Sequence, residues 1–291
     1  MPMHNRRQRK NTGSDSCRDE APERPPFRLL CRFLISLLVL TPGWSWAADI
    51  RLSGLSEKGE LARITLNGEI TAADVARFKD IVGLLKAANV RLTLVELNSR
   101  GGMVIPSMEI GTIIRENWLW TSVGIDDPGA VCYSSCVFIF VGGANRIPPD
   151  LTPIGIHRPF FEAELFAGLD KDDAKKKYNA LLSNVRLYLD KMGIAPNLYQ
   201  AMVQIPSNDL RILTFAEVQN WNISGDDPAY KEYQRAQNIA KYGEAKMREF
   251  DEYIKNTSAY LTECTDKGKP LELCAKETDA KYPNPIADWG K

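Results

Sequence analysis

The residue with the clearest chemical potential is a histidine. The sequence of 291 residues has only two histidines, His4 and His157. If the amino-terminal segment is removed, any mechanism that needs an imidazole must use His157. This residue follows the apolar piece 154–156 and precedes Arg158-Pro159. A histidine is more often structural than catalytic, but functional groups of α/β folds gather at strand ends, so this position raises the weight of a chemical role.

Two adjacent serines come second. Ser134 and Ser135 follow a strand-like piece that ends near Cys132, and an apolar stretch typical of a helix covers residues 135–141. A serine at a strand-to-helix turn can present its hydroxyl beside helix amides. The alternative interpretation is an ordinary serine that caps the helix.

A glycine pair supplies the third candidate. Gly101 and Gly102 end the segment NSRGG, which follows the strand-like residues 91–97. Glycine adopts backbone conformations that other residues resist and leaves its N–H unshielded. Together with the first amides of the helix after Ser134, this loop could form an oxyanion hole.

Composition excludes several classes of protein. The chain has 37 Lys and Arg, 37 Asp and Glu, and 44% apolar residues, which suits a packed core and gives no basic field for nucleic acid. Its six cysteines include no C-x-x-C pair, so a Cys/His zinc site lacks ligands at the usual spacing. We expect no metal, no cofactor and no nucleic acid.

The first 48 residues predict a signal peptide. They hold eight Lys or Arg and four Asp or Glu, and the apolar run 33–41 precedes the pattern Ser45-x-Ala47. This layout predicts export, here to the periplasm, with cleavage after Ala47 or Ala48. An uncleaved anchor in the inner membrane is the alternative.

Export makes disulfides the default for cysteines that can meet. Cys264 and Cys274 flank a short polar loop, and their spacing predicts a bridge. Cys132 and Cys136 lie four residues apart in CYSSC. They could bridge or pack as small apolar side chains, and the sequence leaves both open.

The rest of the chain alternates strand-like and helix-like pieces, which predicts a layered α/β domain over residues 49–226. Residues 227–291 predict a helical extension, with one long helix reaching about Thr262. Packing on its own domain or binding to a partner would both suit that helix. The other predicted elements are strands at 63–66, 91–97, 120–125 with 130–132, and 154–156, and helices at 71–85, 106–114, 135–141 and 171–192.

These segments resemble the proteolytic subunit of Clp protease and the wider Clp/crotonase superfamily. The similar segments, which run from about residue 62 to 223, are LNGEI (66–70), LNSRGGMV (97–104), CYSSCVFIFVGGANR (132–146), IGIHRP (154–159) and SNDLRILTFAEVQNWNI (207–223). The resemblance extends to exported, periplasmic Clp-like proteins with a C-x-S-x-C centre. It implies a stacked ββα superhelix, here followed by the helical extension.

The resemblance also implies roles for single residues. Ser134 would be the nucleophile, with Ser135 as its rival, and His157 would be the general base. The N–H groups of Ser135 and of Gly102, beside Gly101, would form the oxyanion hole. The third member of the triad falls at Leu210, one position from Asp209, and Asp209 as the residue that orients His157 stays open.

The implied function is an exported serine peptidase that works through a serine acyl-enzyme on peptides or unfolded chains. The resemblance further implies a homo-oligomer, built through the helix at 171–192. No ATP-driven unfoldase is expected, because an exported protein meets no ATP supply. The alternative is a non-catalytic Clp-like scaffold of the cell envelope, which the bulky Tyr133 and the displaced Asp209 favour. A Ser-Lys peptidase is a third interpretation that the position of His157 disfavours.

Overall fold

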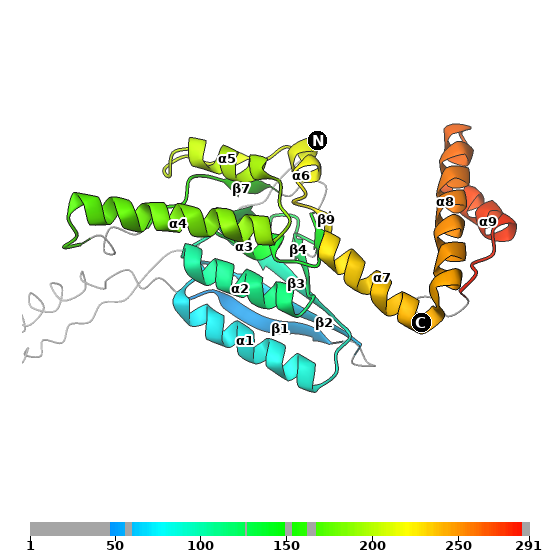
Figure 1. Ribbon diagram of the computed structural model, residues 1–291, viewed down its shortest axis with the longest axis horizontal. Helices are drawn as coiled ribbons and strands as arrows, with labels where there is room; N and C mark the ends of the chain where they lie inside the picture. Colours follow the sequence, from blue (N-terminus) through cyan, green and yellow to red (C-terminus); the bar gives the residue numbers. More distant parts are fainter. Residues whose placement is uncertain (1–46, 56–59, 126, 149–152, 162–166, 287–291) are drawn as a thin grey trace, which may run out of the picture. The chain divides into compact units, whose positions relative to one another are not determined.

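A computed structural model describes residues 47–55, 60–125, 127–148, 153–161 and 167–286 (Figure 1). The predicted signal peptide lies outside these residues except for Ala47 and Ala48. None of the helices in the described ranges is both long enough and apolar enough to cross a membrane.

Nine strands in the described residues form two sheets. The larger sheet has the order β1-β2-β3-β4-β6-β9, with β2, β3, β4 and β6 parallel and the two outer strands antiparallel to their neighbours. The smaller sheet has the order β5-β7-β8, with β5 and β7 parallel. The strands are β1 (Asp49–Leu55), β2 (Leu61–Asn67), β3 (Leu92–Asn98), β4 (Trp120–Val123), β5 (Cys132–Tyr133), β6 (Asn145–Ile147), β7 (Ile154–Ile156), β8 (Arg211–Ile212) and β9 (Gly225–Asp226).

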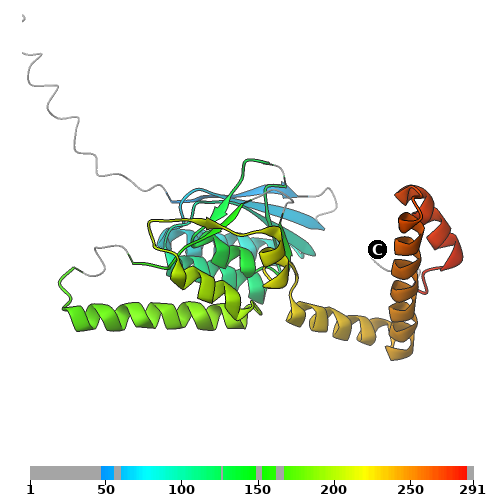
Figure 2. The ribbon, with the colours of Figure 1, turned by 90° about the horizontal axis from the view of Figure 1, so that it is seen from above.

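Helices follow most strands and cover one face of the larger sheet, as the alternating pattern predicts (Figures 1 and 2). The helices are α1 (Ala72–Ala87), α2 (Val104–Glu116), α3 (Cys136–Val141), α4 (Lys171–Lys191), α5 (Pro196–Gln204), α6 (Phe215–Asn220), α7 (Pro228–Tyr242), α8 (Glu244–Asp266) and α9 (Leu271–Lys281). The mixed α/β class is the one that the sequence predicts.

Local sequence explains where the helices begin. The predicted capping box of α1 is present, because the buried Asp74 accepts hydrogen bonds from the N–H and hydroxyl of Thr71. Asp170 caps α4 by accepting from the N–H groups of Asp172 and Asp173. Further along α4, the hydroxyl of Tyr188 donates to the Phe138 carbonyl at 2.6 Å, which fixes α4 against α3.

Two predictions about the elements are wrong. Residues 120–125 and 130–132 do not form one strand region: β4 belongs to the larger sheet, whereas Cys132 lies in β5 and pairs with β7 in the smaller one. The predicted long helix after residue 228 is two helices. Gly243 separates α7 from α8 with a φ of +83°, a conformation that glycine adopts without strain.

The carboxyl-terminal extension starts at a buried carboxylate. Asp227 is fully buried, caps α7, and forms ion pairs with Arg115 and with Arg146, the latter at 2.8 Å. Burial lowers the pKa of Arg146 to about 10, and the charge of Asp227 opposes this shift. Trp118 stacks on Tyr233, 5.1 Å between ring centroids. The start of α7 therefore contacts the α/β domain through Trp118, while no residue of α7 is buried.

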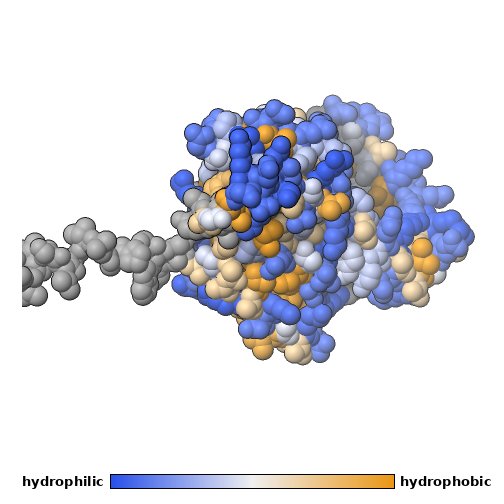
Figure 3. Space-filling model, turned by 60° about the vertical axis from the view of Figure 1, so that its left-hand side comes forward, coloured by the Kyte–Doolittle hydropathy of each residue, from blue (hydrophilic) through white to orange (hydrophobic). Residues whose placement is uncertain are grey.

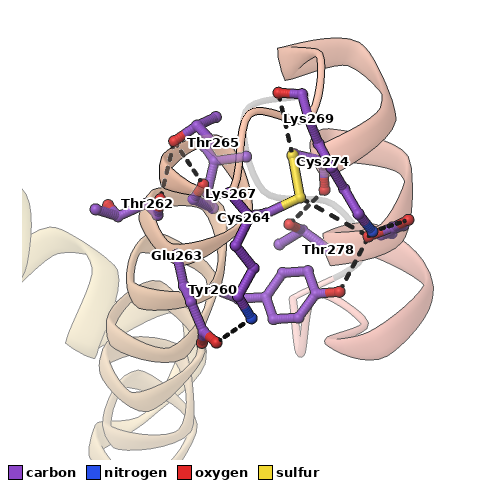
Figure 4. The surroundings of a disulfide bond; sticks show 11 residues. Tyr260, Thr262, Glu263, Cys264, Thr265, Lys267, Lys269, Cys274 and Thr278 are labelled. Carbon is purple, nitrogen blue, oxygen red and sulfur yellow. Dashed lines mark hydrogen bonds and ion pairs between the residues drawn. A yellow bond between two sulfur atoms is a disulfide. The ribbon is translucent and has the colours of Figure 1, made fainter.

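The far end of the extension is a helical hairpin. Cys264 on α8 and Cys274 on α9 form the disulfide that their spacing predicts (Figure 4). Glu277 accepts hydrogen bonds from Tyr260 and Lys269 beside it.

Candidate active site

Ser134 stands at a strained turn. It links β5 to α3 with a φ of +56°, a conformation that non-glycine residues rarely adopt and that clusters at functional sites. The turn is held on both sides: the Ser134 N–H donates to the Gly155 carbonyl at 2.8 Å, and the Tyr133 N–H donates to the Ser99 carbonyl at 3.0 Å. This is the geometry of a nucleophile elbow, which displays its side chain at the edge of a sheet.

The two serines differ in exposure. Ser134 is half-buried, whereas Ser135 is 1% exposed, and its hydroxyl oxygen has no hydrogen-bond partner among the described residues. Ser134 is therefore the hydroxyl that a substrate can reach. Ser135 can still contribute its backbone N–H.

A disulfide spans this elbow. Cys132, in β5, and Cys136, the first residue of α3, are bonded, with their Cα atoms 5.3 Å apart. Both side chains are fully buried. Of the two possibilities that the sequence leaves open for this pair, the structure has the bridge.

The glycine loop lies directly against the elbow. Gly101 and Gly102 have φ values of +106° and +145°. The Gly101 carbonyl accepts from the Ile70 N–H at 2.9 Å, which fixes the loop to the segment after β2. A Cβ atom on Gly101 would lie 2.7 Å from the Cβ of Ser134, so only glycine fits there.

Two backbone N–H groups at this junction have no partner. Among the described residues, neither the Gly102 N–H nor the Ser135 N–H donates a hydrogen bond to the protein. Both residues line the same cavity as Ser134. Paired donors of this kind are what an oxyanion hole requires.

His157 follows β7 and lines this cavity as well. It is 9% exposed, and its Nδ1 lies 3.0 Å from the Arg158 carbonyl oxygen. A carbonyl can only accept, so Nδ1 must carry the proton, which leaves Nε2 as a proton acceptor. No hydrogen bond joins Ser134 to His157 in the described residues; in unliganded sites such bonds are often long and tighten when substrate binds.

No hydrogen bond joins Asp209 to His157 among the described residues. It is exposed, and its carboxylate accepts from the Leu210 N–H at 2.8 Å. β7 and β8 pair Ile156 with Arg211, and this register continues toward Leu210 opposite His157. The group that orients the imidazole here is the backbone carbonyl of Arg158. Because any residue at position 158 would supply this carbonyl, the sequence does not reveal it.

Tyr133 does not narrow the cavity, although its bulk predicts that it could. It pairs with Gly155 across β5 and β7, and a Cβ atom on Gly155 would lie 2.7 Å from the Tyr133 ring. The absent side chain of Gly155 gives the ring its space. Tyr133 is not among the residues that line the cavity in the described part of the chain.

The cavity has a volume of about 760 Å³. Several of its lining residues come from segments that the sequence motifs do not single out, such as Met202 on α5.

Figure 3 brings forward the edge where α1 and α2 begin, and apolar residues gather on it among hydrophilic ones. Apolar lining residues of the cavity are Met103, Val104, Ile105, Pro106, Val131, Phe138, Pro159, Phe160, Phe161 and Met202. Such a lining suits apolar side chains of a substrate.

No family model and no curated protein matches the sequence. Two similar solved structures are of the 1510-N membrane-bound stomatin-specific protease, a serine-to-alanine mutant and a lysine-to-alanine mutant in complex with a substrate peptide. Each is 19% identical with a TM-score of 0.43 and covers 56% of this chain, with 76% and 72% of the respective structure covered. A mutant of ClpP1 from Listeria monocytogenes is 15% identical, with a TM-score of 0.44. The similarity covers 58% of this chain and 93% of the ClpP1 chain. At these identities the similarities concern the fold alone.

Proposed function

We propose that the protein is a serine peptidase with Ser134 as nucleophile and His157 as general base. One observation carries the proposal: a strained serine elbow, two unpartnered backbone N–H groups and a histidine with a fixed tautomer line one cavity. These are the parts that acyl transfer needs.

The parts define a reaction sequence. The Ser134 hydroxyl attacks the peptide carbonyl while Nε2 of His157 takes its proton, and the N–H groups of Gly102 and Ser135 donate to the oxyanion. His157 then gives the proton to the leaving amine as the C–N bond breaks. Water attacks the resulting ester by the same route and releases the acid, which restores the Ser134 hydroxyl.

Two features set the substrate class and the type of base. The apolar lining and the cavity volume suit peptides or unfolded chains with large apolar side chains. No lysine lines the cavity in the described residues, which favours His157 over a lysine as the base.

The proposed place of action is an oxidising compartment, because both cysteine pairs of the described chain are disulfides. The end of the leader supports cleavage after Ala47. The Ala48 nitrogen lies 3.2 Å from a carboxylate oxygen of Asp74, and both residues are fully buried. Cleavage after Ala47 would turn that nitrogen into an ammonium group paired with Asp74, whereas cleavage after Ala48 would remove the buried residue.

Amino-terminal sequencing of the exported protein tests this assignment. We expect a chain that begins with Ala48. A chain beginning with Asp49 would contradict the proposed ion pair, and an intact Met1 in a membrane fraction would mean that the leader is an anchor.

We also propose a homo-oligomer. On the side of α4 that faces away from the core, Leu187 is 65% exposed, a single apolar contact that a second copy could cover. Light scattering at micromolar protein should give a multiple of the chain mass. A monomer would contradict the assembly.

Hydrolysis of a peptide library tests the proposed activity. The oxidised protein should cleave beside large apolar residues, and both Ser134→Ala and His157→Ala should lose this activity while keeping the fold. No cleavage by the folded, oxidised protein with any peptide would contradict the proposal.

A specific observation favours one alternative, a non-catalytic Clp-like scaffold that binds a partner in the cell envelope. Asp209, the open candidate for orienting His157, is not among the described residues that line the cavity, and its carboxylate accepts from the Leu210 N–H. A scaffold would bind peptides equally well with Ser134→Ala, and it would release no products.

A further inference from the structure

The Cys132–Cys136 disulfide encloses the reactive serine. Ser134 lies midway between the two bonded residues, so the bridge closes a ring of five residues around it. Each cysteine is also tied to a different element. The Cys132 N–H donates to the Pro153 carbonyl at 3.2 Å, and Cys136 is the first residue of α3.

The elements on either side of the elbow are short, and α3 is held mainly by its burial in the core. β5 has two residues and α3 has six. The residue before α3, Ser135, makes no side-chain capping hydrogen bond, so the first turn of this helix lacks the usual stabilisation. Ser134 must nevertheless keep a left-handed φ, which non-glycine residues resist. Besides the hydrogen bonds that the Ser134 and Tyr133 N–H groups donate to Gly155 and Ser99, a constraint within the turn has to hold this backbone.

We propose that the Cys132–Cys136 disulfide is that constraint, and that it positions Ser134 and the Ser135 N–H for catalysis. The inference rests on the proposed function. Both sulfurs are buried in the core, so solvent reductants do not reach the bond in the folded chain. The disulfide therefore forms while the chain folds. A chain that folds under reducing conditions lacks it, and its Ser134 is misplaced. Cys132 and Cys136 are positioning residues, because neither touches the reacting atoms.

The chemistry of opening the bond is simple. A dithiol reagent supplies two electrons and two protons, the S–S bond breaks to give two thiols, and the reagent becomes a cyclic disulfide. Because the sulfurs are buried, the reduced state is prepared by unfolding the chain and refolding it with the dithiol present.

The test compares two double variants. Cys132→Ala/Cys136→Ala removes the elbow disulfide, and Cys264→Ala/Cys274→Ala is the matched control that removes the other one. The first readout is the rate at which a fluorophosphonate reagent labels Ser134, measured well below the melting temperature of each variant. The second is hydrogen exchange of the Ser134 amide, which is bonded to the Gly155 carbonyl.

The proposal predicts a difference between the variants in both readouts. In the elbow variant, labelling should fall about a hundredfold, the cost of a misplaced reacting group, and the Ser134 amide should exchange faster. The control should match the wild-type chain in both. If the elbow variant fails to fold, the wild-type chain refolded with the dithiol replaces it, and labelling of that chain at the oxidised rate would overturn the proposal.

The two readouts separate this proposal from the proposed function. Unchanged exchange in the elbow variant overturns positioning, whatever the labelling does. Faster exchange with undiminished labelling also overturns it. Faster exchange in a protein that never reacts, even when oxidised, supports the positioning of the backbone and contradicts the peptidase.

Discussion

The two disulfides of the described chain differ in what they hold. Cys132–Cys136 closes five residues around Ser134 inside the α/β core, whereas Cys264–Cys274 closes eleven residues between α8 and α9 in the extension. Loop closure alone would stabilise the fold by about 2 kcal/mol for the first and about 3 kcal/mol for the second. The Cys132–Cys136 bond contributes less to stability, yet it is the one that encloses the proposed nucleophile. We therefore infer that its main role is to fix the position of Ser134.

The largest expected effect is at the centre of the elbow. Ser134→Ala and His157→Ala should each lower peptide hydrolysis by at least about a thousandfold, and the double variant should be no worse, because the two residues act as one unit. Ser135→Ala keeps the backbone N–H and should lose far less. Steady-state rates check this. If Ser135→Ala were inactive and Ser134→Ala active, the nucleophile would be Ser135 and not Ser134.

The next effect compares one glycine from each region. Gly101→Ala adds a methyl group 2.7 Å from the Ser134 Cβ, while Gly268, also at positive φ in the extension, has open space around it. Gly101→Ala should lower kcat about a hundredfold by displacing the elbow, and Gly268→Ala should leave kcat unchanged. If both variants lost kcat equally, the loss would come from strain at any positive-φ glycine and not from displacement of the Ser134 elbow.

The elbow and the glycine loop could be predicted from sequence because residue type carries the geometry there. Gly101 and Gly102 each impose a backbone constraint, and the strand before His157 gives its place at a sheet edge. The C-x-S-x-C spacing places Ser134 between two cysteines, but whether they bridge stays open in the sequence. The disulfide pairing of Cys264 with Cys274 follows from spacing and compartment in the same way.

Other features leave no trace in residue type. The acceptor for His157 is the backbone carbonyl of Arg158, which any residue would supply. β5 has only two residues, so its assignment to the smaller sheet depends on partners distant in sequence. The break at Gly243 lies within a long helical pattern, in which an isolated glycine is often tolerated.

A smaller effect is expected at Asp209. Because its carboxylate accepts from Leu210 and not from His157, Asp209→Asn should change kcat/KM by less than about twofold, the size of a lost exposed contact. The pH dependence of kcat/KM should stay as in the wild-type protein. A tenfold loss with a shifted pH profile would restore Asp209 as the third member of a triad.

The smallest effect on activity is expected in the extension. Cys264→Ala/Cys274→Ala should lower the free energy of unfolding of the α8–α9 hairpin by about 3 kcal/mol. Hydrogen exchange should locate this loss in α8 and α9, with kcat and KM unchanged. A fall in kcat would mean that the hairpin supports the site, which would remove the contrast between the two disulfides.

One measurement tests the central claim most directly, namely mapping the residue that a fluorophosphonate reagent modifies in the oxidised, folded protein. The account predicts a single labelled residue, Ser134, with no label on His157→Ala under the same conditions. Label on Ser135, label that persists without His157, or no label on a chain with both disulfides intact would contradict it.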